Sequence, residues 1–457
     1  MPHFVGQLAF ALLLGTAGFF FARRIGTIRR NIHLGRDIDL TDRPKERWLT
    51  MARVAMGQSK MVVRPVAGIM HILIYVGFIL INIEVLEILI DGLFGTHRVF
   101  APFLGGLYDF LIGTFEWLAF GVLVACVVFL IRRNLLPIAR FKNPEMAGWP
   151  KNDANIILVV EVLLMFALLS MNAADSIAQS RIIEGVWTDP HHYIEAGSFP
   201  ISKWLIPLYD GLSDGGIVAL ERGTWWFHIA GILAFLVYVP YSKHFHIFLA
   251  FPNTWYSDLT PSGRLDNMAS VKKEVDLMMS GDPFAAPPEP AGDAPAEPVS
   301  FGAKDVKDLT WKQLMEAYTC TECGRCTSVC PANTTGKLLS PRKIMMDTRD
   351  RVEEVGRSID AAGGSWGNGD GKSLLGDYIS EEELWACTSC QACVDACPVN
   401  INPMGIILDM RRSLIMEDSK APEPITAMFN NIENNGAPWA FPATDRGKWT
   451  DEIANES

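Results

Sequence analysis

Basic residues are in short supply in this sequence. Its 457 residues include 40 Lys and Arg against 51 Asp and Glu, so the formal net charge is −11 at pH 7. This balance argues against nucleic acid as a partner, because a surface that binds phosphates needs excess positive charge. Cysteine is also scarce: of nine residues, only Cys126 lies outside two short runs. We expect Cys126, which sits in an apolar stretch, to be a small core residue.

The two cysteine runs share one spacing, C-x2-C-x2-C-x3-C-P. Bacterial ferredoxins with two [4Fe–4S] clusters have this spacing; three cysteines of a run wrap one cluster and the fourth ligates the other cluster. The assignment that follows is one cluster on Cys320, Cys323, Cys326 and Cys397, and the other on Cys387, Cys390, Cys393 and Cys330.

Zinc sites and disulfides are the alternatives for these cysteines. A zinc site does not need four cysteines followed by proline, twice over. Disulfides need an oxidising compartment, whereas the topology given below places this part of the chain in the cytoplasm. Iron–sulfur clusters are therefore the favoured interpretation.

Long apolar runs fill the first half of the chain. The mean hydropathy is positive, at +0.18, although the C-terminal half is polar. Each run is close to the ~20 residues that cross a bilayer as a helix. The first has no basic region before it and no clear cleavage site, so we interpret it as a retained helix and not a signal peptide. The five predicted transmembrane helices are residues 4–22, 66–90, 108–131, 155–174 and 224–241.

The loops between these helices alternate in charge. Segments 23–64 and 132–154 are rich in Lys and Arg, whereas 91–107 and 175–223 are poorer. Lys- and Arg-rich loops stay in the cytoplasm. We therefore expect a protein of the bacterial inner membrane with its N-terminus outside and everything after Lys243 in the cytoplasm. Within the last outer segment, residues 201–220 are broken by Pro and Gly and predict a loop with an amphipathic helix.

Histidines stand near the ends of the predicted helices. His71 and His246 have the same cytoplasmic depth, and we predict that they hold one haem b between helices. His244 competes with His246 for this role. The alternative is an interfacial histidine with a hydrogen-bond partner.

A second, outer haem depends on His228. His228 and His246 are 18 residues apart, which on one continuous helix is about 27 Å and five turns, so both would share a face. The partner of His228 is not evident, because Ile81 stands where a second histidine is needed and His97 lies past the predicted helix end. One haem is expected, and a second is left open.

Charged residues in and beside the helices have two interpretations each. Carboxylates inside a membrane are costly, so they either carry protons to or from a quinone or are satisfied by Arg and backbone groups. These carboxylates are Glu84, Glu87, Glu116 and Glu161. Basic residues at the cytoplasmic ends either pair with haem propionates or anchor the helices. These are Arg53, Lys60, Arg64 and Lys243.

The expected fold class is all-α, with a five-helix haem-binding bundle and a helical ferredoxin domain. The stretch between the cysteine runs is long for a compact βαβ ferredoxin and holds helix-like segments at 341–354 and 380–386. The predicted domains are 1–250, transmembrane and cytochrome b-like; 251–303, a Pro/Ala-rich linker; 304–415, the two-cluster ferredoxin domain; and 416–457, a polar tail.

The membrane part resembles the cytochrome b gamma subunit of respiratory nitrate reductase and the membrane subunit of heterodisulfide reductase. The matching residues are Ile69-Met-His71-Ile-Leu-Ile, and His228 and His246 with Pro240 between them. It differs at Ile81, where the nitrate reductase subunit has a fourth ligand. The cysteine runs resemble the C-type subunit of heterodisulfide reductase and the helical ferredoxin half of succinate dehydrogenase iron–sulfur subunits.

The tail resembles a segment that leads into cysteine-rich CCG domains in fused relatives. The matching residues run from Asn434-Asn435-Gly-Ala-Pro438-Trp439 to Trp449. The fused relatives resemble electron-transfer-flavoprotein:menaquinone oxidoreductases. No CCG cysteines, no G-x-G-x-x-G and no flavin motif follow here. The resemblance therefore implies a separate cytoplasmic catalytic subunit, either a CCG-domain protein or an electron-transfer flavoprotein.

Motifs and resemblance together imply an electron-transfer subunit with no catalytic residue of its own. It would link a cytoplasmic redox partner to a membrane quinone, menaquinone or ubiquinone, through two [4Fe–4S] clusters and haem b. A quinol-oxidising subunit of a heterodisulfide reductase-like complex is one alternative. A mainly structural membrane anchor for a soluble redox enzyme is the other.

Overall fold

The computed structural model describes residues 2–185, 195, 197–261, 263–265, 267–280, 301–364 and 369–456. Within these ranges helices form the whole architecture, and β-structure is limited to two isolated bridges, Arg36–Thr310 and Leu375–Ile379. The predicted all-α fold class is confirmed.

Each predicted apolar run is a long helix, and each helix is long and apolar enough to cross a membrane. These helices are α1 (Pro2–Ile32), α3 (Pro65–Phe94), α5 (Gly106–Asn134), α6 (Trp149–Ile183) and α8 (Asp214–Tyr238). All are longer than predicted. The expectation of a loop over 201–220 is partly wrong, because α8 already begins at Asp214, where the Ser213 hydroxyl caps it by accepting from the Gly216 N–H. Only α7 (Ile206–Tyr209) and a short 3-10 turn precede it there.

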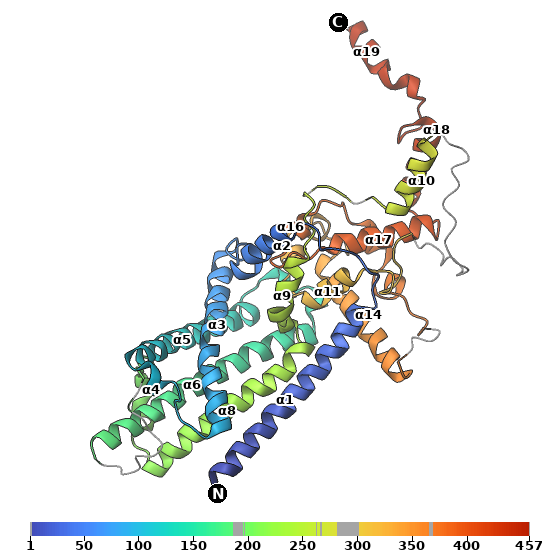
Figure 1. Cartoon of the computed structure of the whole chain (residues 1–457). Helices are drawn as coiled ribbons and strands as arrows, with labels where there is room; N and C mark the ends of the chain where they lie inside the picture. Colours follow the sequence, from blue (N-terminus) through green and yellow to red (C-terminus); the bar gives the residue numbers. More distant parts are fainter. Residues whose placement is uncertain are drawn as a thin grey trace.

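The long helices run side by side, with the N-terminus at the end of the bundle away from the cysteine-rich half (Figure 1). Helix α5 packs on α3 and α6, α6 packs on α8, and α1 covers α8 and α3. Large apolar side chains stay exposed along their outer faces, among them Phe4, Leu12, Phe20, Phe78 and Phe110. Such exposure is unfavourable in water and favourable in hydrocarbon, so the bundle is a membrane-spanning one.

Shorter helices complete the chain. Those of the first half are α2 (Pro44–Met51), α4 (Ala101–Leu104), α9 (His246–Trp255) and α10 (Ala269–Met279). Those of the second half are α11 (Trp311–Thr319), α12 (Arg325–Val329), α13 (Pro331–Thr334), α14 (Pro341–Ala361), α15 (Glu381–Trp385), α16 (Ala392–Asp395), α17 (Pro403–Met416), α18 (Glu423–Asn435) and α19 (Lys448–Glu456). The two helix-like segments predicted between the cysteine runs are α14 and α15. A capping box of Ser380 and Glu383 starts α15.

The range 251–303, predicted as a linker, differs from that expectation. Helix α9 extends through its first residues, and Asn253 and Thr254 are fully buried. Helix α10 lies further along the same range. The Pro/Ala-rich stretch itself, residues 281–300, lies outside the described residues.

One apolar core joins the membrane bundle to the cysteine-rich region predicted as the ferredoxin domain, residues 304–415, which we call the ferredoxin half. Ile28 at the end of α1 and Phe245 belong to the same buried cluster as Leu314 and Val352. The backbone adds a bridge: the Arg36 N–H donates to the Leu309 carbonyl at 2.7 Å. The ferredoxin half is therefore seated on one end of the helix bundle, the end at which α1 finishes.

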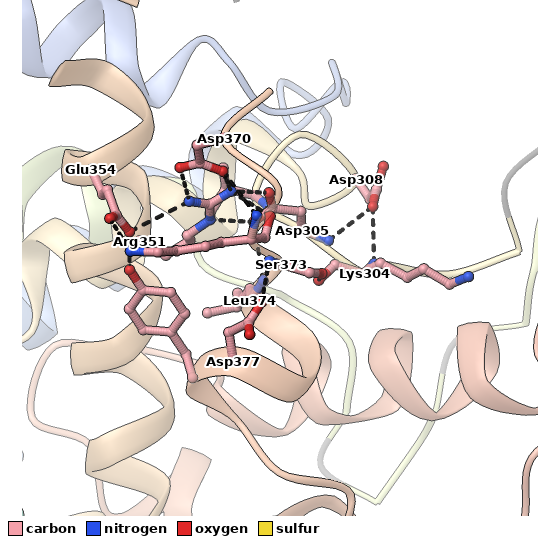
Figure 2. Close-up of polar contacts among 12 residues, drawn as sticks. Lys304, Asp305, Asp308, Arg351, Glu354, Asp370, Ser373, Leu374 and Asp377 are labelled. Carbon is pink, nitrogen blue, oxygen red and sulfur yellow. Dashed lines mark hydrogen bonds and ion pairs between the residues drawn. The ribbon is translucent and has the colours of Figure 1, made fainter. Parts of the chain in front are cut away.

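Inside the ferredoxin half, Arg351 of α14 ties three segments together (Figure 2). Its guanidinium donates to Asp305 at 2.7 and 2.9 Å and to Asp370 at 2.6 and 2.9 Å. It also pairs with Glu354 at 3.4 Å. Because Asp305 in turn accepts from the Leu374 N–H at 3.2 Å, the segment that opens the ferredoxin half and the loop after α14 are both fastened to one buried cation.

Candidate electron-transfer centres

The two cysteine runs fold alike. In each run, the residues before and after the second cysteine have a left-handed backbone conformation. In the first run these are Glu322 (φ 52°) and Gly324 (φ 70°), and in the second run they are Ser389 (φ 53°) and Gln391 (φ 60°). These turns wrap the chain tightly, and a short helix, α12 or α16, follows immediately. The repeated spacing in the sequence thus becomes a repeated loop.

The first group of thiols gathers Cys320, Cys323, Cys326 and Cys397. Burial raises the pKa of Cys320 to about 12, with Glu322 and the thiols of Cys323 and Cys397 adding to the rise. Burial likewise raises the pKa of Cys397 to about 11, again with a contribution from Cys323. The structure therefore brings the last cysteine of the second run to the first run.

The second group gathers Cys387, Cys390, Cys393 and Cys330. Burial raises the pKa of Cys393 to about 12, and Cys387, Cys330 and Cys390 raise it further. Here too the fourth member comes from the other run. In each group the interactions reach across the two runs, and Cys326 also interacts with Cys393. The crossed assignment of ligands to two clusters stays a prediction.

The surroundings of the thiols suit iron–sulfur clusters. All nine cysteines are free thiols. Backbone N–H groups point at two of the sulfurs, from Ser389 to Cys387 at 3.4 Å and from Ile401 to Cys397 at 3.3 Å, the kind of contact that tunes a cluster. Among the described residues no three His, Cys, Asp or Glu side chains lie close enough together to hold a single metal ion. Thiolates around a cubane stand further apart than thiolates around one ion.

His71 and His246 face each other at the end of the bundle that carries the ferredoxin half. Their ring centroids are 6.4 Å apart and the ring planes make an angle of 38°. Two imidazoles bound about 2 Å from one iron, on opposite faces, have ring centres about 6 Å apart. The His246 Nδ1–H donates to the Lys243 carbonyl at 3.0 Å, which leaves Nε2 for a ligand. The residues fit a haem held by two histidines.

His244 lies beside this pair. Its ring centroid is 5.5 Å from that of His246, edge to face, and 5.5 Å from that of Phe235. Burial lowers the pKa of His244 to about 3, and it lowers the pKa of His246 as well. Both imidazoles are therefore neutral, the form that binds metals, and His246 is the one that faces His71.

The expectation that His228 and His246 share one helix is wrong. Helix α8 ends at Tyr238, and two 3-10 turns, Val239–Tyr241 and Lys243–Phe245, precede α9. The second residue of the first turn is Pro240, which lacks an N–H and breaks the helix. His228 is buried in α8, and its Nδ1–H donates to the Leu164 carbonyl at 2.9 Å. Among the described residues no second imidazole is in ring contact with His228, and the outer haem stays an open prediction.

The intramembrane carboxylates divide into two kinds. Glu87 accepts from the Phe100 N–H and the Tyr108 hydroxyl, both at 2.8 Å, and Glu116 accepts from the Ile201 N–H at 2.9 Å. These two hold outer loops on the bundle. Glu84 and Glu161 form no hydrogen bond or ion pair with the described residues; Glu84 is only 6% exposed.

Three of the basic residues expected near propionates bind the ferredoxin half instead. Lys60 donates to the Asp395 carbonyl at 3.1 Å, and Arg64 donates to the Ser328 hydroxyl at 2.6 Å. Lys243 forms an ion pair with Glu322, inside the first cysteine run. The sequence analysis did not single out Glu322. The sequence does show a carboxylate between two predicted ligand cysteines, and this could have identified it.

Comparison with known proteins supports the iron–sulfur part of this description. Residues 319–401 match the family model of a 4Fe-4S dicluster domain. The chain is 28% identical over 472 residues to a probable iron-sulfur-binding oxidoreductase, FadF, of Bacillus subtilis, an alignment that covers 97% of this chain and 61% of the relative. It is 28% identical over 439 residues to an EtfAB:quinone oxidoreductase of Syntrophomonas wolfei, covering 91% and 55%.

One more relative is similar over a shorter stretch. A part of the chain is 30% identical over 122 residues to the C-type subunit of a ferredoxin/F(420)H(2)-dependent CoB-CoM heterodisulfide reductase of Methanosarcina acetivorans, covering 26% of this chain and 60% of that relative. No solved structure matches the chain. The chain is therefore an iron–sulfur membrane protein related to these oxidoreductases, and it spans 61% and 55% of the length of the first two.

Proposed function

We propose that this chain is the electron-transfer subunit of a quinone-linked membrane oxidoreductase. Electrons pass between a cytoplasmic redox partner and a membrane quinone. The two [4Fe–4S] clusters and one haem b supply the one-electron chemistry. The chain binds these groups, sets their order and excludes water from them.

The observation that carries this proposal is the pairing of His71 with His246 next to the first thiol group. The imidazole pair has the separation that a bis-histidine haem needs. The turn before His246 touches the loop of the first cysteine run through Lys243 and Glu322. Cys320 and Cys397 belong to the same buried core as Phe245, the residue directly before His246.

Quinone reduction fed by an electron-transfer flavoprotein is the first choice for the direction. It is supported by the similarity to an EtfAB:quinone oxidoreductase over 91% of this chain. Quinol oxidation that drives disulfide chemistry on a CCG-domain partner is the second, supported by the similarity of a part of the chain to a heterodisulfide reductase subunit. The Lys- and Arg-rich segments 23–64 and 132–154 favour a cytoplasmic ferredoxin half.

Reduction by menaquinol tests the proposal. The purified chain should show a Soret band that shifts when menaquinol is added without oxygen. His71→Leu and His246→Leu should lose the band, because each removes one side of the pair, whereas His228→Leu should keep it. A mere membrane anchor would give no spectral change with menaquinol. A Soret band that survives in both His71→Leu and His246→Leu would contradict the ligand assignment.

A further inference from the structure

One ion pair connects the loop of the first cysteine run to the turn that carries His246. Glu322 lies between Cys320 and Cys323, and its carboxylate pairs with the Lys243 ammonium. Both residues are buried, with exposed fractions of 3% and 8%. The carbonyl of the same Lys243 accepts the His246 Nδ1–H at 3.0 Å. Lys243 therefore contacts the loop of the first cysteine run with its side chain and the His246 ring with its backbone.

Each charge of this pair is held by further contacts. The other oxygen of Glu322 accepts from Arg349 at 2.7 Å. On the other side, Asp153 accepts from the Lys243 N–H at 3.1 Å and lies 3.9 Å from the ammonium. Buried ions kept in such a satisfied arrangement fix one geometry, and removing one partner leaves the other charge uncompensated. The contact thus holds the loop and the turn in one relative position.

The second cysteine run shows that the loop itself does not need a carboxylate. Ser389 occupies the place of Glu322, with the same left-handed backbone (φ 53° against 52°). Its hydroxyl accepts only a long bond, 3.4 Å, from Arg411 within the ferredoxin half. The left-handed turn therefore does not require a carboxylate, and Glu322 differs from Ser389 in that it joins Arg349 of α14 to Lys243 of the membrane half.

The two thiol groups also differ in how far one of their cysteines is exposed and in which segments lie beside them. Cys320 is buried, whereas Cys390 is exposed and lies next to Gln391, whose side chain donates to the Arg264 carbonyl at 3.1 Å. Nearby, the Arg411 guanidinium stacks over the Trp385 ring at 5.0 Å. Through Gln391 the second run thus contacts the segment after α9, and its last turn reaches Lys60 of the membrane half through the Asp395 carbonyl.

We propose that the Lys243–Glu322 ion pair is a positioning contact that makes the first thiol group the relay next to the His71–His246 site. The second thiol group is then the one that faces the cytoplasmic partner. The inference rests on the proposed function and deepens it, because it orders the centres. Two consequences follow. Loss of the Glu322 charge makes the neighbouring group easier to reduce. Loss of the ion pair also releases the Lys243 side chain from the cysteine loop and shifts the turn that orients His246.

Glu322→Gln tests this in the full-length chain in detergent, with Ser389→Ala as the matched control in the other loop. Redox titration followed by EPR should show an upward shift in the midpoint of one cluster only. The haem EPR signal should shift in the same variant. Ser389→Ala should leave the haem signal and the first cluster where they are. Lys243→Met removes the partner of Glu322 that belongs to the membrane half. It should change the midpoint of the same cluster and the haem EPR signal.

The outcomes separate the inference from the proposed function. A wild-type chain that holds no haem overturns both. A haem-loaded chain whose haem signal does not move in Glu322→Gln or in Lys243→Met overturns the inference alone. So does a haem signal that moves as much in Ser389→Ala, because the second group would then lie equally close to the His71–His246 site.

Discussion

Both cysteine loops contain residues other than glycine in a left-handed backbone conformation. Glu322, Ser389 and Gln391 all have φ between 52° and 60°, a conformation that costs an ordinary L-residue about 1–2 kcal/mol. Such strain persists only where the surroundings determine it. The proposed wrapping of each loop around a cluster would provide such a constraint.

The crossed arrangement of thiols is testable by single substitutions. Cys397→Ser should remove the same EPR signal as Cys320→Ser, and Cys330→Ser the same signal as Cys387→Ser, because each fourth cysteine serves the other run. Iron content should fall to about half in each variant if the remaining cluster stays intact. An uncrossed arrangement would instead group Cys397→Ser with Cys387→Ser.

At the scale of elements, the crossing of α1 and α14 leaves no room for a side chain. Asn31 is fully buried there and donates to the Tyr318 hydroxyl at 3.0 Å. Gly356 of α14 faces it, and the Arg30 guanidinium donates to the Gly356 carbonyl at 3.0 Å. A Cβ on Gly356 would lie 2.5 Å from the Asn31 Oδ1, so the two helices touch only because this residue is glycine.

Gly356→Ala should therefore destabilise the protein by about 1–3 kcal/mol through overpacking. The measurement is the Tm in detergent. Gly26→Ala in α1 is the matched control, because a Cβ there meets nothing within 4 Å; it should be neutral or stabilising by about 0.5–1 kcal/mol. Equal Tm values for the two variants would contradict the close crossing.

Arg351 is the other element-scale contact with a clear consequence. Arg351→Met leaves Asp305 and Asp370 without their main partner, and both are only about one-fifth exposed (23% and 20%). Breaking a fully buried pair costs about 3–5 kcal/mol, and partial exposure reduces this to about 2–3 kcal/mol. Limited proteolysis should cut near residue 370 sooner, and the Tm should fall. Arg357→Met, an exposed position on the same helix, should change the stability by less than about 0.5 kcal/mol.

At the scale of the whole molecule, an odd number of long helices separates the N-terminus from the ferredoxin half (Figure 1). The arginine-rich end of α1 and the segment 132–154 lie on the side of the cysteine runs, as the contact of Arg24 with Glu353 at 2.7 Å and that of Arg342 with the Arg140 carbonyl at 2.8 Å demonstrate. The positive side of the bundle is thus the side with the clusters.

Reporter fusions should reveal this asymmetry in cells. Alkaline phosphatase at the N-terminus should be active, and a fluorescent protein at the C-terminus should fluoresce, because positive loops stay inside. The reverse pattern would contradict both the orientation and a cytoplasmic redox partner. Fusion at both ends of the same chain provides the internal control.

Much of the fold was predictable from the sequence because the relevant signals are local. The five apolar runs, the segments that became α14 and α15, and the repeated cysteine spacing all lie within short windows. The depth of His71 and His246 also pointed to their proximity, although their role as ligands stays a prediction. The continuous helix from His228 to His246 was wrong, because one proline in an apolar run does not reveal that two 3-10 turns follow it.

By itself, the sequence determined the helical class, the membrane spans and the two cysteine loops, since periodicity and spacing act over a few residues. The tertiary structure alone decided that α1 crosses α14 at Gly356, that the core continues from bundle to ferredoxin half, and that Glu322 meets Lys243. Those contacts join residues far apart in the chain. They depend on how packed helices are placed in space, which no local pattern encodes.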